Sequence, residues 1–130
     1  MMKPFCEVMV QEVLPAIRGI VANQLTRKYG MSQKRAAFLL GLSQPAISQY
    51  RRELRGYRAD MIKGSDKLAD MVAKLAEGLA SGEIRDYEST LRLCHICKEM
   101  RKSGLACKMH RERDPSLESC SVCMYQENSR

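Results

Sequence analysis

Five of the six cysteines in this 130-residue chain lie within a stretch of thirty residues near its C-terminal end. They form a C-x2-C pair, a single cysteine and a second C-x2-C pair. Thiolates at such spacing bind soft metal centres or exchange disulfides, so this cluster is the first candidate for chemistry. The candidate metal ligands are Cys94, Cys97, Cys107, Cys120 and Cys123.

Three kinds of chemistry fit this cluster, and the sequence leaves all three open. A structural zinc ion would take four thiolates, most simply the two C-x2-C pairs, although neither pair has the glycine and turn residues that usually flank such sites. An iron–sulfur cluster is wider than one metal ion, so it can gather cysteines from two helices and a loop, and its loss or oxidation gives a regulator a signal to sense. Disulfides or a thiol redox switch are the third alternative.

Three further residues are weaker candidates for the same site. Cys6 is expected to be a small buried hydrophobe, as lone cysteines usually are, and the alternative is that it reaches the C-terminal cluster. His95 and His110 are expected at the surface or among the residues that surround the metal ligands. His110, however, follows Cys107 by three residues and could replace a thiolate.

Helices must position these cysteines, because apolar residues recur at three- and four-residue steps along most of the chain. Residues 83–102 form one such pattern, in which five residues fall near one face: Ile84, Tyr87, Leu91, Cys94 and Cys97. Gly104 ends that helix. The remainder is short and polar, apart from a last helical turn that starts at Asp114 and Pro115, and the tail from Gln126 is expected to fray. This composition, without Trp and with two Phe, predicts an all-α protein.

Two longer helices are predicted before the cysteine segment. Residues 1–9 form a lead-in, and a first amphipathic helix extends to about Lys28, either starting near Leu14 or kinked at Pro15. Its apolar positions are Val10, Val13, Leu14, Ile17, Ile20, Val21 and Leu25. Residues 55–67 are expected to be a linker because Gly56 and Gly64 interrupt it.

Ser65 then caps a helix that ends at Gly82, with an apolar stripe along it. The stripe consists of Leu68, Val72, Leu75 and Leu79. It either covers the preceding helices or forms the seam of a homodimer.

Residues 32–54 carry two short helical patterns joined by a turn. Ser32 caps the first helix, and Gly41 ends it in a left-handed conformation that lets the chain reverse. Ser43 caps the second helix, Pro45 lies in its first turn, and Ile47 and Tyr50 point back toward the first helix. The alternative is an ordinary helical hairpin within a bundle.

Short polar side chains face outward between the buried positions of this unit, and arginines follow them. Amides and hydroxyls suit base edges in a major groove, and guanidinium groups suit phosphates. The expected base-edge contacts come from Gln44, Ser48 and Gln49, with Ser43 beside them, and the expected phosphate contacts from Gln33, Lys34, Arg51, Arg52 and Arg55.

The charge distribution also indicates DNA as the partner. The formal net charge is +7, and residues 27–58 hold eight Lys or Arg against the single acid Glu53. Such a segment releases counterions from a phosphate backbone, so double-stranded DNA is the expected partner.

The small Ala37, the turn glycine Gly41 and the aliphatic Ile47 resemble the helix-turn-helix of the lambda Cro and repressor (Xre-type) family, over roughly residues 11–58. Most of the chain is also similar to predicted archaeal transcriptional regulators that add a cysteine-rich C-terminal segment. The first resemblance implies operator binding as a homodimer, and the second favours an iron–sulfur centre over zinc.

Together these patterns predict a helix-turn-helix DNA-binding domain in residues 1–58 and a helical dimerisation and metal-binding segment in residues 59–130. The expected function is a sequence-specific transcriptional regulator controlled by a cysteine-ligated iron–sulfur centre. The alternatives are a regulator with a purely structural zinc site and a metal-stabilised protein-interaction adaptor. An enzyme is not expected, because the sequence has no nucleophile with an ordered base, no phosphate-binding glycine loop and no carboxylate pair. With no long apolar run and no signal-peptide layout, we expect a cytoplasmic protein without a membrane partner.

Overall fold

The computed structural model describes residues 4–52 and 57–120, and every regular element in this part of the chain is helical, which confirms the all-α prediction. The elements are α1 (Phe5–Val8), η1 (Met9–Val13), α2 (Leu14–Asn23), η2 (Gln24–Lys28), α3 (Gln33–Leu40), α4 (Gln44–Arg52), α5 (Tyr57–Lys63), α6 (Asp66–Ser81), α7 (Asp86–Lys102), α8 (Leu105–Arg113) and η4 (Pro115–Leu117). Among them, η1 and η2 are π-helical turns and η4 is a 3-10 turn.

The first helix starts earlier than the sequence predicted. Helical backbone runs from Phe5 through α1, η1, α2 and η2 to Lys28, so only residue 4 of the predicted lead-in is non-helical in the described chain. Pro15 has no N–H to donate, and the chain accommodates it with the π-helical turn just before it, in which the N–H of Leu14 bonds to the carbonyl of Met9.

This π-helical turn also changes which residues face the core. A π turn contains more residues than an α turn, so the apolar stripe before Leu14 is displaced from the 3.6-residue pattern. Val8 is buried and Met9 is only 7% exposed, whereas Val10, which was predicted to be apolar contact surface, is 61% exposed. The prediction for Val10 was therefore wrong.

The segment after α4 was predicted to be a linker, and this too was wrong. Residues 57–63 form α5, which buries Ala59 and Ile62 against the first helix. Gly64 and Ser65 make the turn into α6, and the Ser65 hydroxyl accepts a hydrogen bond from the N–H of Leu68, as expected of its cap. A glycine-bounded stretch of seven residues is thus long enough to contribute a buried helical turn to the core.

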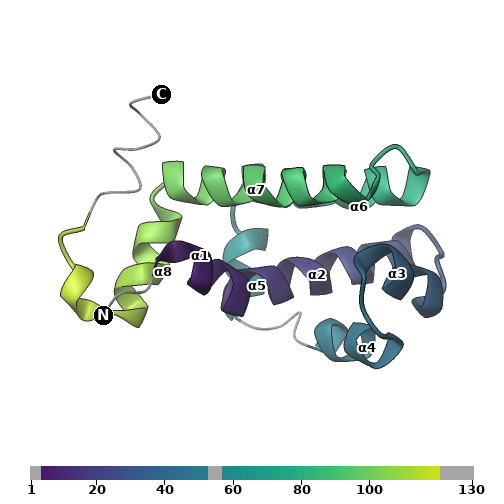
Figure 1. The fold of residues 1–130 in the computed structure, drawn as a ribbon, viewed down its shortest axis with the longest axis horizontal. Helices are drawn as coiled ribbons and strands as arrows, with labels where there is room; N and C mark the ends of the chain where they lie inside the picture. The colour runs from purple at the N-terminus through teal and green to yellow at the C-terminus, as the bar shows by residue number, and fades with distance from the viewer. Residues whose placement is uncertain (1–3, 53–56, 121–130) are drawn as a thin grey trace.

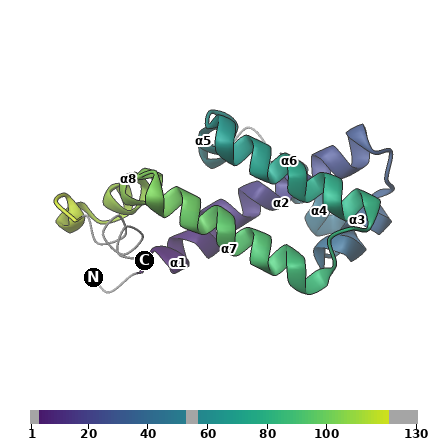
Figure 2. The ribbon, with the colours of Figure 1, turned by 90° about the horizontal axis from the view of Figure 1, so that it is seen from above.

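Helices α6 and α7 form a hairpin that lies over α2, while α3 and α4 lie near the end of α2 farthest from α8 (Figures 1 and 2). Gly78 is buried in this hairpin, and a Cβ there would collide with Ile84, so the glycine allows the close approach of the loop after α6. The hairpin therefore covers one side of α2.

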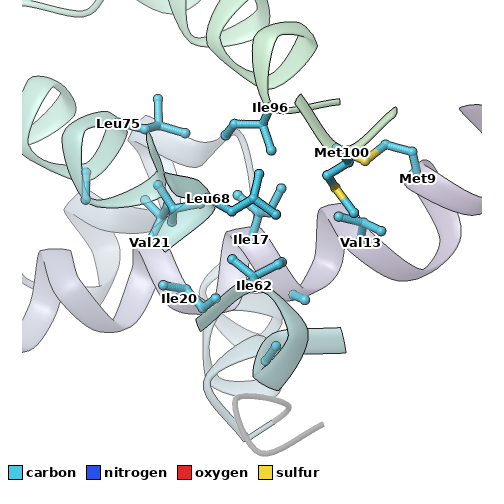
Figure 3. Close-up of a cluster of buried hydrophobic side chains, with 14 of the residues drawn as sticks. Met9, Val13, Ile17, Ile20, Val21, Ile62, Leu68, Leu75, Ile96 and Met100 are labelled. Carbon is cyan, nitrogen blue, oxygen red and sulfur yellow. The ribbon is translucent and has the colours of Figure 1, made fainter. Parts of the chain in front are cut away.

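One hydrophobic core joins residues on both sides of position 58. The predicted α6 stripe is buried within the chain, and Figure 3 shows Leu68 and Leu75 beside Ile17 and Val21 of α2, with Ile96 of α7 next to them. The stripe therefore covers the preceding helices, and it is not an exposed dimer seam in this chain.

The cysteine-bearing end contains a helix that the sequence analysis missed. Gly104, with a φ of 85°, ends α7 as expected, but the following residues form α8 rather than irregular chain. Ala106 and Met109 of α8 are buried in the same core as the first helix. No helix in the described residues is long and apolar enough to span a bilayer.

We predict that Val8→Ala lowers the free energy of unfolding by about 2 kcal/mol, because it removes two buried methyl groups and leaves a cavity. Val10→Ala is the matched control and should change stability by less than about 0.5 kcal/mol, because Val10 is exposed. Urea unfolding followed by circular dichroism measures both values. Equal losses would mean that the π-helical register is incorrect.

Candidate nucleic-acid interface

The first of the two short helices begins and ends where the sequence predicted. The Ser32 hydroxyl accepts a hydrogen bond from the N–H of Arg35 at 3.1 Å, which caps α3. Ala36 and Ala37 are buried on one side of the helix. Lys34 and Arg35 are exposed on it, so α3 has one face in the core and a basic face in solvent.

Gly41 makes the reversal after α3 in a Schellman motif. Its φ is 66°, in the left-handed region that glycine adopts without strain. The N–H of Leu42 bonds to the carbonyl of Ala37 at 2.8 Å, and the N–H of Gly41 bonds to that of Phe38 at 3.2 Å. Leu42 then packs beside Ala37, the apolar contact that usually accompanies this motif. The turn is thus fixed by both hydrogen bonds and packing.

The second short helix, α4, also starts as predicted. The Ser43 hydroxyl accepts from the N–H of Ala46 at 3.3 Å, and its carbonyl accepts from the N–H of Ile47 at 3.2 Å. Pro45 lies in the first turn of α4, where its missing N–H is not needed. Three residues therefore separate the two helices, namely 41–43.

A small apolar cluster holds α2, α3 and α4 together. Ala22, Ala37 and Ile47 are buried at its centre, one from each helix, and Leu40 and Leu42 pack around them. The two alanines allow the helix backbones to approach closely, while Ile47 fills the space between them. The predicted inward position of Ile47 is confirmed, and the side chain of Tyr50 lies outside the described residues.

Of the six predicted DNA-contacting side chains that the structure describes, four are exposed on the outside of this unit, which we call the α3–α4 surface. Lys34, Ser43, Gln44 and Gln49 are exposed, and Gln33 and Ser48 are half-buried. The Ser48 hydroxyl lies 3.4 Å from the Oε1 atom of Gln33, to which it donates, so these two residues connect α4 to α3. The side chains of Arg51 and Arg52, and the whole of Arg55, lie outside the described residues.

Two aromatic contacts on this side of the molecule were not anticipated. The guanidinium of Arg35 lies 5.8 Å from the ring centroid of Phe38, and the ammonium of Lys28 lies 5.5 Å from that of Tyr29. Phe38 is 75% exposed although it belongs to a helix with a buried face. The sequence contained a signal for this exposure. Phe38 follows Lys34 by four residues and lies opposite Ala36 and Ala37, outside the predicted apolar side of the helix.

The clustered cysteines occupy different environments. Cys94 is exposed on α7, Cys97 is half-buried beside the core, Cys107 is buried on α8, and Cys120 follows η4. No disulfide joins these four within the described residues, and Cys123 lies outside the described residues. Within the described chain, no three His, Cys, Asp or Glu side chains are grouped closely enough to hold a metal ion. The metal-ligand prediction therefore stays a prediction.

Polar contacts fix the segment that leads to Cys120. The Arg111 guanidinium donates to the Cys120 carbonyl at 2.9 Å, and Arg113 pairs with Glu12 of η1 at 2.7 Å. Asp114 caps η4 as expected, accepting from the N–H and the hydroxyl of Ser116. The hydroxyl bond, at 2.6 Å, lowers the pKa of the Asp114 carboxyl, so this cap persists into mildly acidic solution.

The three weaker candidates for the metal site lie on different helices. Cys6 is exposed on α1, so the expectation that it is a buried hydrophobe was wrong, because its helix begins earlier than predicted and turns it outward. His95 is exposed on α7 and His110 is half-buried on α8. On the α7 face predicted from sequence, Tyr87, Leu91 and Cys94 are exposed.

Comparison with known proteins adds no relative. No protein-family model, no curated protein and no solved structure matches this chain.

We predict that Gly41→Ala lowers the free energy of unfolding by about 1 to 2 kcal/mol, because a Cβ is strained in the left-handed region. The space around residue 41 is open, so the cost comes from the backbone alone. Gly41→Asn is the control and should cost less, since asparagine tolerates this conformation. Chemical denaturation compares the two variants, and an alanine variant as stable as the asparagine variant would contradict the role of the turn.

Proposed function

We propose that the chain is a sequence-specific DNA-binding transcriptional regulator of the helix-turn-helix type, without enzymatic activity of its own. The observation that carries the proposal is the solvent exposure of Gln44 and Gln49 on a helix that is held against α2 and α3 by the buried Ile47. A helix held in this way can enter a major groove without unfolding any of its supports.

The proposed roles follow the chemistry of the α3–α4 surface. Gln44 and Gln49 offer an amide donor and acceptor to the edge of a base, adenine above all. Ser48 has a hydroxyl engaged with Gln33, so it orients the two helices and contributes less to base recognition. Lys34 and Gln33 at the start of α3 would contact the phosphate backbone, together with Ser43 at the start of α4 and the arginines that follow.

Net positive charge supports the same proposal. Lys28, Lys34 and Arg35 are exposed around α3, and the described part of residues 27–58 contains no acidic residue. Lys34 and Arg35 form no ion pair with any described carboxylate. These cations remain available to replace counterions on DNA, which makes the binding dependent on salt.

We further propose that the regulator is a homodimer. Since the α6 stripe is buried within each chain, the contact has to use another surface. The exposed apolar residues Tyr87 and Leu91, 74% and 54% exposed, lie one turn apart on α7 and offer such a surface. A two-fold axis there would join two copies of the chain.

The third part of the proposal is a cysteine-ligated iron–sulfur centre in residues 94–123 that controls DNA binding, with a structural zinc ion as the alternative. Thiolates are the donors that both centres prefer, and Cys94 and Cys97 lie three residues apart on α7, which packs against α8. When bound, an iron–sulfur cluster would supply sensitivity to oxidants or iron. Arg113 and Glu12 connect this end to the first helix, which also supports α3 and α4.

We predict different effects for two substitutions in the α4 region, once a high-affinity duplex has been selected from a random pool. Gln44→Ala should lose about 1 to 3 kcal/mol of discrimination between bases at one position, because it removes a base contact. Arg52→Ala should weaken binding to all duplexes alike and lower the salt slope by about one unit, because it removes a phosphate contact.

Gln11→Ala is the matched control, since Gln11 is an exposed glutamine on η1 outside the proposed surface. It should bind every duplex like the unchanged protein. Fluorescence anisotropy at several salt concentrations measures these effects. If Gln44→Ala and Arg52→Ala behave identically, the division of roles is incorrect, and if the unchanged protein selects no duplex, the proposed function fails.

We predict that protein purified without oxygen shows a broad visible absorption band and contains iron and acid-labile sulfide. Replacing Cys94 and Cys97 with serine should abolish both, because it removes one C-x2-C pair. Cys6→Ser is the control and should retain them. Colourless protein with one zinc ion per chain would identify the structural alternative, and protein without either metal would exclude both centres.

A further inference from the structure

The outward side of α3 carries two apolar side chains that pack against neither core. Phe38 is 75% exposed, more than any other large apolar side chain in the described part of the chain. Leu39 is half-buried, yet it belongs to neither of the two buried clusters and is not packed against them. Covering such side chains with another surface is favourable, because it removes apolar area from water. We call Arg35, Phe38 and Leu39 the Phe38 face.

Helical spacing places these three side chains next to one another. Phe38 and Leu39 follow Arg35 by three and four residues, the two separations at which side chains on a helix are neighbours. The Arg35 guanidinium lies 5.8 Å from the centroid of the Phe38 ring, within the range of a cation–π contact. Aromatic residues and arginine are enriched at protein–protein interfaces and carry much of their binding energy. The Phe38 face therefore has the composition of an interface centre.

The Phe38 face is also positively charged. No described carboxylate forms an ion pair with Arg35 or with its neighbour Lys34, and both side chains are exposed. The described part of residues 27–58 contains no acidic residue. A guanidinium can bind one carboxylate through two parallel hydrogen bonds, which is a strong and specific contact. The charge of the face therefore favours an acidic occupant.

The orientation of the Phe38 face separates it from α4. Gln33 accepts a hydrogen bond from Ser48 of α4, so the Gln33 side of α3 is the side that faces α4. Phe38 follows Gln33 by five residues, which is a rotation of about 140° around an α-helix. A duplex backbone could offer phosphates to Arg35, but it has no apolar surface for Phe38 and Leu39. DNA is therefore a poor occupant of this face.

A second copy of the chain is also a poor occupant. A two-fold contact uses the same patch on both subunits, so it would bring Arg35 and Lys34 of one copy close to the same residues of the other. Like charges that face each other across an interface oppose association. An acidic surface on a different protein would instead be attracted to these residues.

We propose that the Phe38 face is the docking site for a partner protein that presents an acidic segment with an apolar side chain. The carboxylates of that segment bind Arg35, and its apolar side chain covers Phe38 and Leu39. Helix α3 lies near the end of α2 farthest from α8, so the face is also distant from the clustered cysteines (Figure 1). The proposal depends neither on DNA binding nor on a metal centre.

The experiment selects short peptides from a random library displayed on phage, with the folded full chain as the target. We expect the selected peptides to combine Asp or Glu with Phe, Trp or Leu. Fluorescence anisotropy of labelled synthetic copies then gives their dissociation constants. Binding should weaken as the salt concentration rises, because salt screens the attraction between Arg35 and the carboxylates of the peptide.

Two variants test the assigned residues, and each has a matched control. Phe38→Ala and Arg35→Ala should each weaken peptide binding about tenfold or more, as truncation of a central interface residue does. Tyr87→Ala and Arg92→Ala remove an equally exposed aromatic ring and an exposed arginine on α7, and they should leave binding unchanged. The N–H of residue 35 that caps α3 belongs to the backbone, so Arg35→Ala retains the cap. Circular dichroism checks that all four variants are folded.

Three results would overturn the proposal. One is a selection that yields no acidic peptide with an apolar residue, and another is a selected peptide that binds Phe38→Ala as tightly as the unchanged protein. The third is a tenfold loss of affinity of Phe38→Ala for the selected DNA duplex, which would assign the face to the DNA interface. Peptide binding is measured without DNA, so a chain that binds no duplex would contradict the proposed function and leave this proposal standing.

Discussion

Burial of the first helix on two sides is the constraint on which the rest of the structure depends. One side of α2 carries Ile17 and Val21 into the main core beneath α6 and α7. The side that carries Ala22 holds α3 and α4 through the small cluster around Ile47. The large side chains of α2 face one neighbour and its small side chain faces another, so both neighbours can pack closely against it. The position of α4 is therefore fixed by α2.

Both ends of the molecule pack against the first helix. The first helix touches α8 near its start and α3 and α4 near its end, and it contains two π-helical turns. Such turns are less regular than α-helix and often occur at functional positions. The first helix is therefore packed continuously from the cysteine-bearing end to the α3–α4 surface.

The polar contacts are of two kinds, helix caps and an ion pair between distant segments. Caps at Ser32, Ser43 and Ser65 fix where helices begin, each by a hydrogen bond to the backbone N–H three residues later. The pair between Arg113 and Glu12 connects residues 101 positions apart, but it is partly exposed and adds little stability. Apolar packing fixes the overall arrangement, and the caps make each helix boundary sharp.

The sequence by itself determined the features that depend on neighbouring residues. Ser32, Gly41 and Ser43 specified the turn between α3 and α4, since capping and left-handed backbone are chemical properties of single residues. The α6 stripe was equally predictable from its spacing. Only the tertiary structure decided what that stripe covers, because a buried seam and a dimer seam have the same periodicity. It also decided the register before Pro15, where a π-helical turn exposes Val10 and buries Val8. It likewise decided that residues 57–63 form a helix, because Ala59 and Ile62 are buried against the distant first helix. These outcomes rest on contacts between segments far apart in the chain, which no local pattern encodes.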